Sequence, residues 1–337
     1  MCLYIRKQKS KSEIMVFLIG SFPQMRYEEM EAEDNISTVI QLVLLGFSDL
    51  PNLQVLLFGV LSIIYIIILT GNSLIIILTR LDPTLQKPMY FFLANFSSLE
   101  ICSVSVTLPR ILVNLWTQDR SISVLDCAAQ MCFFLILGAT ECFLLAVMAY
   151  DRCVAICGPL HCPLVMTPKV CLQLAVGSWV SGIPVQTGQT RWIFSLHFCH
   201  LNEINHFFCD IPPILKLACG DTFAHAPSVC VAVLLVAAVP FILILASYSK
   251  IVCTILRLPT ARRAKAFSTY SSHLLVVLLF FGSATITYLR PKSRHSAGTD
   301  RLLSLFYTVV TPTFNPMIDS LQNKGVIAAL RKLLLKV

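Results

Sequence analysis

Charged residues are scarce in this chain of 337 residues. Asp, Glu, Lys and Arg make up 13% of it, against 56% hydrophobic residues, and the mean hydropathy is +0.76. Soluble domains carry about 25% charged residues. A chain of this composition would expose large apolar patches in water, so the sequence excludes an ordinary soluble globular protein. We expect lipid to be its solvent.

Other absences narrow the class further. No Gly/Ser-rich linker or block of charge divides the chain, and its two halves are not similar to each other. One domain is therefore expected, without the inverted repeats of many transporters. No constellation of catalytic side chains supports an enzyme. The cations flank apolar segments and do not line one face, which argues against nucleic-acid binding.

Seven apolar segments are long enough to cross a bilayer. They lie at 55–79, 89–113, 127–157, 170–187, 226–254, 266–290 and 302–322. The fourth is the weakest, since Gly177, Ser178, Ser181 and Gly182 dilute it. The polar stretch 188–225 is expected to be a loop. The sequence thus predicts an all-α membrane protein, a bundle of seven transmembrane helices at 55–322.

Lysine and arginine predict the orientation of this bundle. With the N-terminus outside, the cytoplasmic segments hold 13 cations against two acids, and the extracellular loops hold eight cations against six acids. This positive-inside bias predicts an extracellular N-terminal tail at 30–54 and a short cytoplasmic tail at 323–337. Residues 1–29 are expected to be a disordered upstream extension. Asn35, in an Asn-Ile-Ser acceptor sequence, then lies where N-glycosylation occurs.

Two motifs carry a family resemblance. The segment MAYDRCVAIC at 148–157 resembles the third helix of olfactory receptors, a branch of the rhodopsin-like (class A) G-protein-coupled receptors. HFFCDIPPILKLACGDT at 206–222 is similar to the second extracellular loop of the same family. The resemblance runs from about Gly46 to Leu330. It implies a receptor in the plasma membrane that binds an odorant and activates a heterotrimeric G protein.

Four cysteines lie on the predicted extracellular side, where disulfides persist: Cys127, Cys199, Cys209 and Cys219. Four cysteines allow three pairings. The resemblance favours Cys127–Cys209 and Cys199–Cys219, so the long second loop would be disulfide-bonded. A zinc site that adds His197, His200 and His206 is the alternative, but it would need reduced thiols in an oxidising compartment.

Two carboxylates lie inside the predicted bundle. Glu141 precedes Arg152 by 11 residues and Glu100 follows Met89 by 11, which places both about 16 Å from the cytoplasmic end. Two such groups cannot both be bare anions in a dry core. In the resembled family this pair, with Asn72 and Asn315, forms a pocket for sodium and water. A protonated, hydrogen-bonded pair without an ion is the alternative. No other cofactor or metal is expected.

The resemblance also assigns a G-protein switch at the cytoplasmic end. Asp151 would hold Arg152 in a local ion pair at rest and release it on activation. The start of the sixth helix would contribute Lys265 and His273, with His273 contacting the third helix or the G protein. The seventh helix would add Asn315, Pro316 and Asp319.

The outer half of the bundle excludes some ligands. No lysine lies between Leu302 and Leu321, so a retinal Schiff base is excluded, and the third helix has no carboxylate where amine receptors place one. The side chains expected to face the interior of this outer half suit a small, neutral, mainly hydrophobic molecule, although each of them could equally be a plain helix-packing residue. The expected ligand pocket comprises Phe134, Leu135, Gly138, Ala139, Phe281, Ala284, Thr285, Tyr288, Leu305 and Thr308.

Several positions depart from the family pattern. Asp319 stands where the family has tyrosine, and Cys153 follows the Asp-Arg pair in place of an aromatic residue; Gly158, Phe281 and Gln322 differ too. The predicted function is nevertheless an odorant receptor that activates a stimulatory olfactory-type G protein and raises cyclic AMP. A decayed, non-signalling receptor is one alternative. A channel or transporter is another, although Glu100 and Glu141 alone do not line a path.

Overall fold

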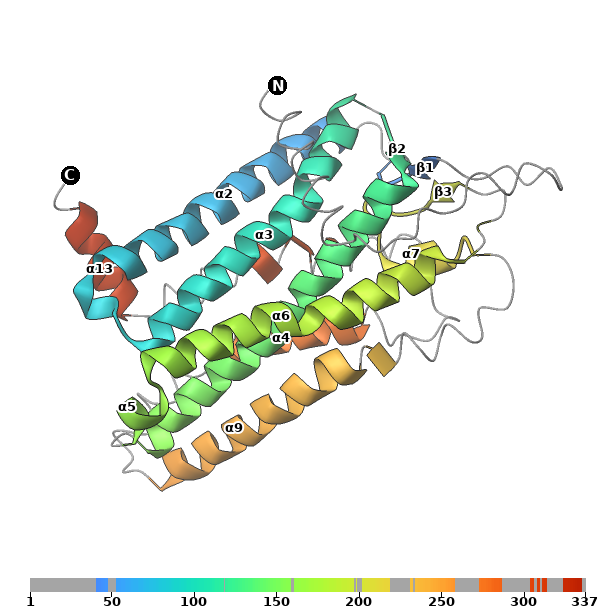
Figure 1. Ribbon diagram of the computed structural model, residues 1–337. Coiled ribbons are helices and arrows are strands. Elements are labelled where there is room, and N and C mark those ends of the chain that lie inside the picture. Colours follow the sequence, from blue (N-terminus) through green and yellow to red (C-terminus); the bar gives the residue numbers. More distant parts are fainter. Residues whose placement is uncertain are drawn as a thin grey trace.

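Five long helices lie side by side in a bundle (Figure 1). They are α2 (Gln54–Leu81), α3 (Pro88–Thr117), α4 (Val124–Cys157), α6 (Pro168–Phe194) and α9 (Val239–Leu256). The computed structural model describes residues 41–47, 53–117, 119–158, 161–196, 198, 202–218, 231–232, 234–257, 273–286, 304–305, 308–309, 311–313 and 324–334. Statements about structure below concern these residues.

Four of the described helices are long and apolar enough to cross a membrane: α2, α3, α4 and the segment Leu234–Leu256, which joins the π-helix η4 (Leu234–Ala238) to α9. A shorter apolar helix covers His273–Ile286. α6 has 27 residues but is not among the four, in keeping with the small and polar residues that weaken the fourth predicted segment. It also continues to Phe194, seven residues past the predicted end.

Two of these helices begin at an N-cap residue whose side chain accepts a backbone hydrogen bond. Ser123 Oγ accepts a hydrogen bond from Asp126 N (3.0 Å) and donates one to Asp126 Oδ2 (2.8 Å), so the start of α4 is capped from both directions. Thr167 Oγ1 accepts from Val170 N (3.4 Å) at the start of α6, where Pro168 fits the first helical position. Both caps fix the ends of helices that line the central cavity.

A three-stranded sheet lies at one end of the bundle (Figure 1). β1 (Gln41–Leu44) is its central strand and pairs antiparallel with β2 (Ser121–Ser123) and parallel with β3 (Glu203–Ile204). Leu42, Leu44, Ile122 and Ile204 pack beneath it against α4 and the short helix α7 (Ile211–Leu215). This strand was not predicted from the sequence, in which residues 30–54 were expected to be an extracellular tail.

The opposite end carries η2 (Pro83–Leu85), α5 (Cys162–Val165) and α13 (Lys324–Leu334). Val326 and Ala329 of α13 are buried against Ile75, Leu78 and Leu85. Lys332 Nζ lies 3.6 Å from Asp82 Oδ2, an ion pair between α13 and the loop after α2. The last helix is thus docked by both apolar contact and charge.

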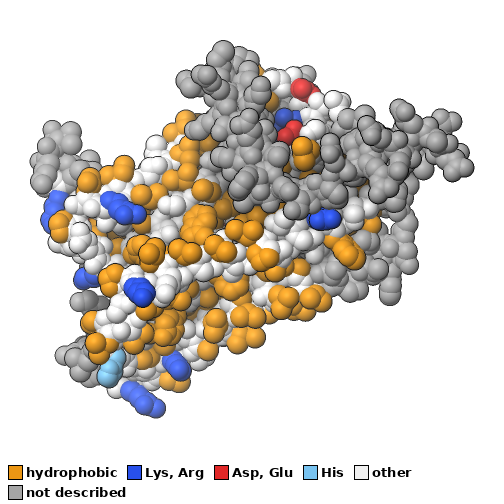
Figure 2. All heavy atoms as spheres, in the orientation of Figure 1, with side chains coloured by type: hydrophobic (Ala, Val, Ile, Leu, Met, Phe, Trp, Pro, Cys, Tyr) orange, Lys and Arg blue, Asp and Glu red, His pale blue; other side chains and the backbone are white. Residues whose placement is uncertain are grey.

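Hydrophobic side chains cover the outside of the bundle as well as its interior. Figure 2 shows them over much of the visible face, and Val55, Ile63, Leu172 and Ile242 are all more than half exposed. Inside, the largest core cluster joins α3, α4, α6, α9 and His273–Ile286 around Phe92, Phe96 and Leu144. Such an exterior is stable only in contact with lipid.

Candidate functional site

A cavity of about 1090 Å³, including its open mouth, lies within the bundle. Residues from α3, α4, α6, η4 and His273–Ile286 line it, and most of the lining is apolar. Seven residues of the expected ligand pocket line it: Phe134, Leu135, Gly138, Ala139, Phe281, Ala284 and Thr308. The structure therefore brings together residues that lie up to 174 positions apart, from Phe134 to Thr308.

Two residues of the expected pocket lie elsewhere. Thr285 is exposed, because a helix turns by about 100° per residue and Thr285 follows the lining residue Ala284. Leu305 packs in a different apolar cluster, with Phe207 and Phe208. Neither residue is among those that line the cavity. Tyr288 lies outside the described residues.

The cavity also has polar lining residues that sequence reasoning missed. Ser103 and Thr107 come from α3, and Gln186 and Gln189 from α6. The predicted fourth segment ended at residue 187, which placed Gln189 in a loop. The signal was present in the sequence, since polar residues spaced by three or four on an apolar helix share one face.

The three described members of the expected ion pocket are all buried. Asn72 is 0% exposed, Glu100 1% and Glu141 8%. Asn72 Nδ2 donates to Ile68 O (2.9 Å). Among the described residues, neither Asn72 Oδ1 nor Glu141 Oε1 has a hydrogen-bond partner. Glu100 and Glu141 are close enough to interact electrostatically. Glu141 also lines the ligand cavity, so the two sites are continuous.

Near the C-terminal end of α4, Asp151 and Arg152 are both buried, at 5% and 9% exposure. No ion pair joins their side chains in the part of the chain that the structure describes, so the expected resting-state pair is absent here. Adjacent residues of a helix point about 100° apart, which disfavours that contact. Arg152 Nε has no hydrogen-bond partner.

His273 is fully buried, and its described partner is not on the third helix. The Tyr248 hydroxyl of α9 hydrogen-bonds His273 Nδ1, with the rings stacked at a centroid distance of 6.0 Å. His273 still lies near enough to Arg152 for their charges to interact. The predicted contact thus omitted Tyr248, which joins the fifth and sixth helices. Lys265, Asn315, Pro316 and Asp319 lie outside the described residues.

The disulfide Cys127–Cys209 is present in the structure, with its Cα atoms 5.4 Å apart, and it joins α4 to the loop before α7. Gln130, one turn further along α4, donates to Val106 O (3.2 Å) and accepts from Cys209 N (3.1 Å). Ile211, two residues after Cys209, lines the ligand cavity. The disulfide therefore holds part of the cavity wall.

The second predicted disulfide, the glycosylation site and most of the alternative zinc site involve residues that the structure does not describe. Cys199, Cys219 and Asn35 fall outside the described residues, as do His197 and His200. His206 is buried, with Nδ1 3.1 Å from Phe208 O and its ring stacked on Phe207 at 4.5 Å. Within the described ranges, no group of three or more His, Cys, Asp or Glu residues could hold a metal ion.

Comparison with known proteins places this architecture in one family. The sequence profile described as "Olfactory receptor" matches residues 61–337. Human olfactory receptor 10AG1 is 57% identical over 299 residues, which cover 88% of this chain and 99% of that protein. Human olfactory receptors 10C1 and 10A5 are 52% and 51% identical, and each alignment covers 90% of this chain and at least 96% of the relative.

The likeness spans the helices, the disulfide-bonded loop and the cavity together, and it exceeds what a shared fold alone would give. Members of this family are bundles of seven transmembrane helices and are not enzymes. The chain belongs to the olfactory receptor family and is an odorant-sensing, multi-pass G-protein-coupled receptor.

Proposed function

We propose that this receptor binds a small, neutral, mainly hydrophobic odorant in the central cavity. The observation that carries the proposal is the cavity's lining: Phe134, Leu135, Phe280 and Phe281 supply apolar contact, and only a few polar side chains interrupt them. Ligand pockets of this kind gain affinity from apolar burial and orientation from one or two hydrogen bonds. Gln186 or Thr107 would donate to a carbonyl or ether oxygen.

Gly138 gives a direct test. A Cβ added there meets nothing within 4 Å, and the residue lines the cavity, so a larger side chain would occupy ligand space without a backbone clash. Gly138→Leu should reduce the odorant response at least about ten-fold, because it removes room for several ligand atoms. Gly177→Leu is the matched control, since Gly177 is exposed on α6 with open space around it.

The measurement is a cyclic AMP reporter in cells, with each response normalised to receptor at the surface. An odorant first has to be found by screening the native chain. If Gly138→Leu responds like Gly177→Leu to every active odorant, the cavity is not the odorant site. If no odorant activates a native chain that stains well at the surface, the alternative of a non-signalling receptor holds.

We also propose that activation raises cyclic AMP through a stimulatory olfactory-type G protein. The support is the family resemblance and a cytoplasmic end in which Arg152 lies beside the Tyr248–His273 pair. An outward movement of the sixth helix would separate His273 from its neighbours and expose Arg152. Loss of the response in cells that lack the stimulatory α subunit, with restoration on its return, is the expected result.

The orientation is part of the same proposal, with the N-terminus outside and α13 in the cytosol. Most Lys and Arg side chains visible in Figure 2 lie at the end that carries α5 and α13. The opposite end carries the disulfide, which requires an oxidising compartment. Both observations agree with the positive-inside rule.

We further propose that Glu100 and Glu141 hold a sodium ion with Asn72. Asn72 Oδ1 and Glu141 Oε1 are buried acceptors without protein partners, and such oxygens suit a hard cation. Bound sodium would neutralise the carboxylates and stabilise the inactive bundle. Purified receptor should melt at a higher temperature in NaCl than in equimolar choline chloride, and Glu141→Gln should abolish the difference. Equal melting in both salts would favour the protonated pair.

A further inference from the structure

A second, smaller pocket lies beneath the extracellular sheet and shares no lining residue with the odorant cavity. It is bounded by the end of β1, the start of α2, the last turns of α3, and Phe207. Its space, including the open mouth, is about 320 Å³, less than a third of that of the odorant cavity. Only a molecule of a few non-hydrogen atoms would fit.

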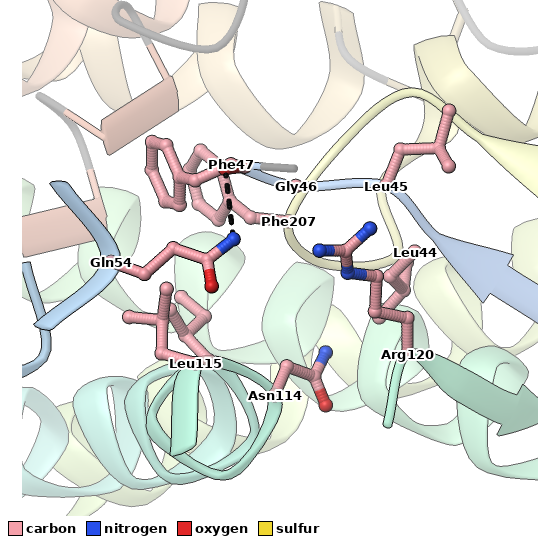
Figure 3. A pocket seen from close by; sticks show the side chains of 10 residues that line it. Leu44, Leu45, Gly46, Phe47, Gln54, Asn114, Leu115, Arg120 and Phe207 are labelled. Atoms are coloured by element: carbon pink, nitrogen blue, oxygen red, sulfur yellow. Dashed lines mark hydrogen bonds between the residues drawn. The ribbon is translucent and has the colours of Figure 1, made fainter. Parts of the chain in front are cut away.

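Three polar side chains converge on this space. Figure 3 shows the polar ends of Gln54, Asn114 and Arg120 directed toward one another from three different segments. Gln54 Nε2 donates to Phe47 O at 3.5 Å, which holds the amide at the rim. Asn114 Oδ1 is buried and has no hydrogen-bond partner among the described residues.

Arg120 is the charged member of this group, and its position is fixed by the sheet. Its backbone oxygen accepts from Leu44 N at 2.9 Å. Its guanidinium, by contrast, forms no hydrogen bond or ion pair with any of the described residues. The adjacent acid is committed elsewhere, because Asp119 Oδ1 accepts from Ser121 N (3.1 Å) and Ser121 Oγ (2.7 Å). Arg120 therefore brings to the pocket a cation that no described acid pairs with.

The other wall is apolar and rigid. Phe47 and Phe207 stack with ring centroids 5.4 Å apart, and Leu44 and Ile111 are almost fully buried. Gly46 makes this wall possible, since its φ of 48° is a left-handed conformation that side chains disfavour. A ligand with an anionic head and one or two carbon atoms would match both walls. A free inorganic ion would leave the apolar wall unused.

We propose that this pocket binds a small monocarboxylate, with Arg120 as its ionic partner and the amides of Asn114 and Gln54 as further contacts. Arginine suits a carboxylate because its planar fork can donate two parallel hydrogen bonds. Binding would tie β1 to the end of α3 and so stabilise the extracellular cap by linkage. The site does not depend on which odorant the main cavity takes.

The test uses the full-length receptor in lipid nanodiscs and follows thermal unfolding during a titration with sodium acetate, at constant ionic strength kept with NaCl. Acetate should give a saturable rise in melting temperature, with a dissociation constant in about the millimolar range expected of four non-hydrogen atoms. Acetamide, the neutral isostere, should give no rise. A rise with acetamide, or an equal one with NaCl alone, would overturn the proposal.

Substitutions inside and outside the small pocket test whether acetate binds there. Arg120→Gln should raise the acetate dissociation constant at least about ten-fold, since a charge-assisted contact is lost. Leu115→Phe, which fills the apolar side and keeps the charge, should weaken acetate too. Arg191→Gln, an exposed arginine near the end of α6, and Gly138→Leu in the odorant cavity should leave it unchanged. Undiminished acetate binding by both Arg120→Gln and Leu115→Phe would refute the site.

Discussion

Gln130 shows how one side chain can hold three segments together. Its amide bridges Val106 of α3 and Cys209 of the extracellular loop, while its own backbone belongs to α4. The sequence did not predict this bridging role, because a glutamine near the start of an apolar helix also suits a position among the lipid headgroups. Its role depends on where the disulfide brings residue 209, and helical periodicity cannot supply that information.

Replacing this residue gives a prediction about stability. Gln130→Leu leaves the buried Cys209 N–H without an acceptor, which costs about 1–3 kcal/mol. Purified receptor should therefore melt at a lower temperature than the native chain. Gln173→Leu, at an exposed position of α6, is the control and should change little. Equal melting of the two variants would mean that water or a backbone shift replaces the lost acceptor.

Arg152 is expected to matter for signalling more than for folding. It is buried, its Nε is unpartnered, and Asp151 forms no ion pair with it, so few contacts are lost on truncation. Arg152→Ala should stain normally at the cell surface and lose at least about ten-fold in odorant-stimulated cyclic AMP, whereas Arg152→Lys should retain part of the signal. Full signalling by the alanine variant would remove the switch role proposed for Arg152.

Among helices, the contact between α4 and α6 is the closest that the described glycines reveal. A Cβ built on Gly182 would lie 2.5 Å from Ala139 Cβ, closer than side chains tolerate, so the absence of a side chain allows the two helices to approach. The same approach brings Gln186 and Gln189 to the cavity wall opposite Ala139. Gly182, one of the residues that dilute the fourth predicted helix, is therefore a packing residue.

A pair of substitutions tests this contact. Gly182→Ala should destabilise the receptor by about 1–3 kcal/mol through overpacking, and Ala139→Gly in the same chain should restore most of the loss. Gly177→Ala, with nothing within 4 Å, is the control. Melting temperatures of the purified variants give the comparison. If the destabilisation caused by the two substitutions were additive in the double variant, residues 139 and 182 would not be in contact.

The disulfide gives a prediction for the loop. Cys127 and Cys209 are 82 residues apart, and closing a loop of that length stabilises a folded chain by roughly 4–5 kcal/mol in the chain-entropy model. Cys127→Ser and Cys209→Ser should each be retained inside the cell, and the double variant should be no worse than either. Peptide mapping that paired Cys127 with Cys199 or Cys219 would contradict this connectivity.

The sequence predicted the helices far better than the sheet, for a physical reason. Apolar length marks a membrane helix locally, so α2, α3 and α4 begin and end within four residues of the predicted segments. β1 has only four residues, and its partners lie about 80 and 160 residues away in the chain. The cavity residues of α4 were predicted by comparison with the position at which amine receptors carry a carboxylate, and all four line the cavity. Thr285 does not, because its side chain points away from the cavity on the helix that carries Ala284.

For the whole molecule, the distribution of Lys and Arg and the position of the disulfide predict the same membrane orientation, with the N-terminus outside. Asn35 precedes β1 by six residues in the sequence, and β1 lies at the same end of the bundle as the disulfide. The receptor expressed in mammalian cells should shift to lower mass after treatment with peptide N-glycosidase, and Asn35→Gln should abolish the shift. An antibody against an N-terminal tag should stain unpermeabilised cells. Staining only after permeabilisation would reverse the orientation.

The central position of β1 also sets an order of events during synthesis. Val43 faces Glu203 in the sheet, and 160 residues separate them. At about 5–20 residues per second, roughly 8–32 s pass between the synthesis of the first strand and that of its parallel partner. The segments that form α2, α3, α4 and α6 are made during that interval. The complete sheet can therefore form only after four of the long helical segments have been synthesised.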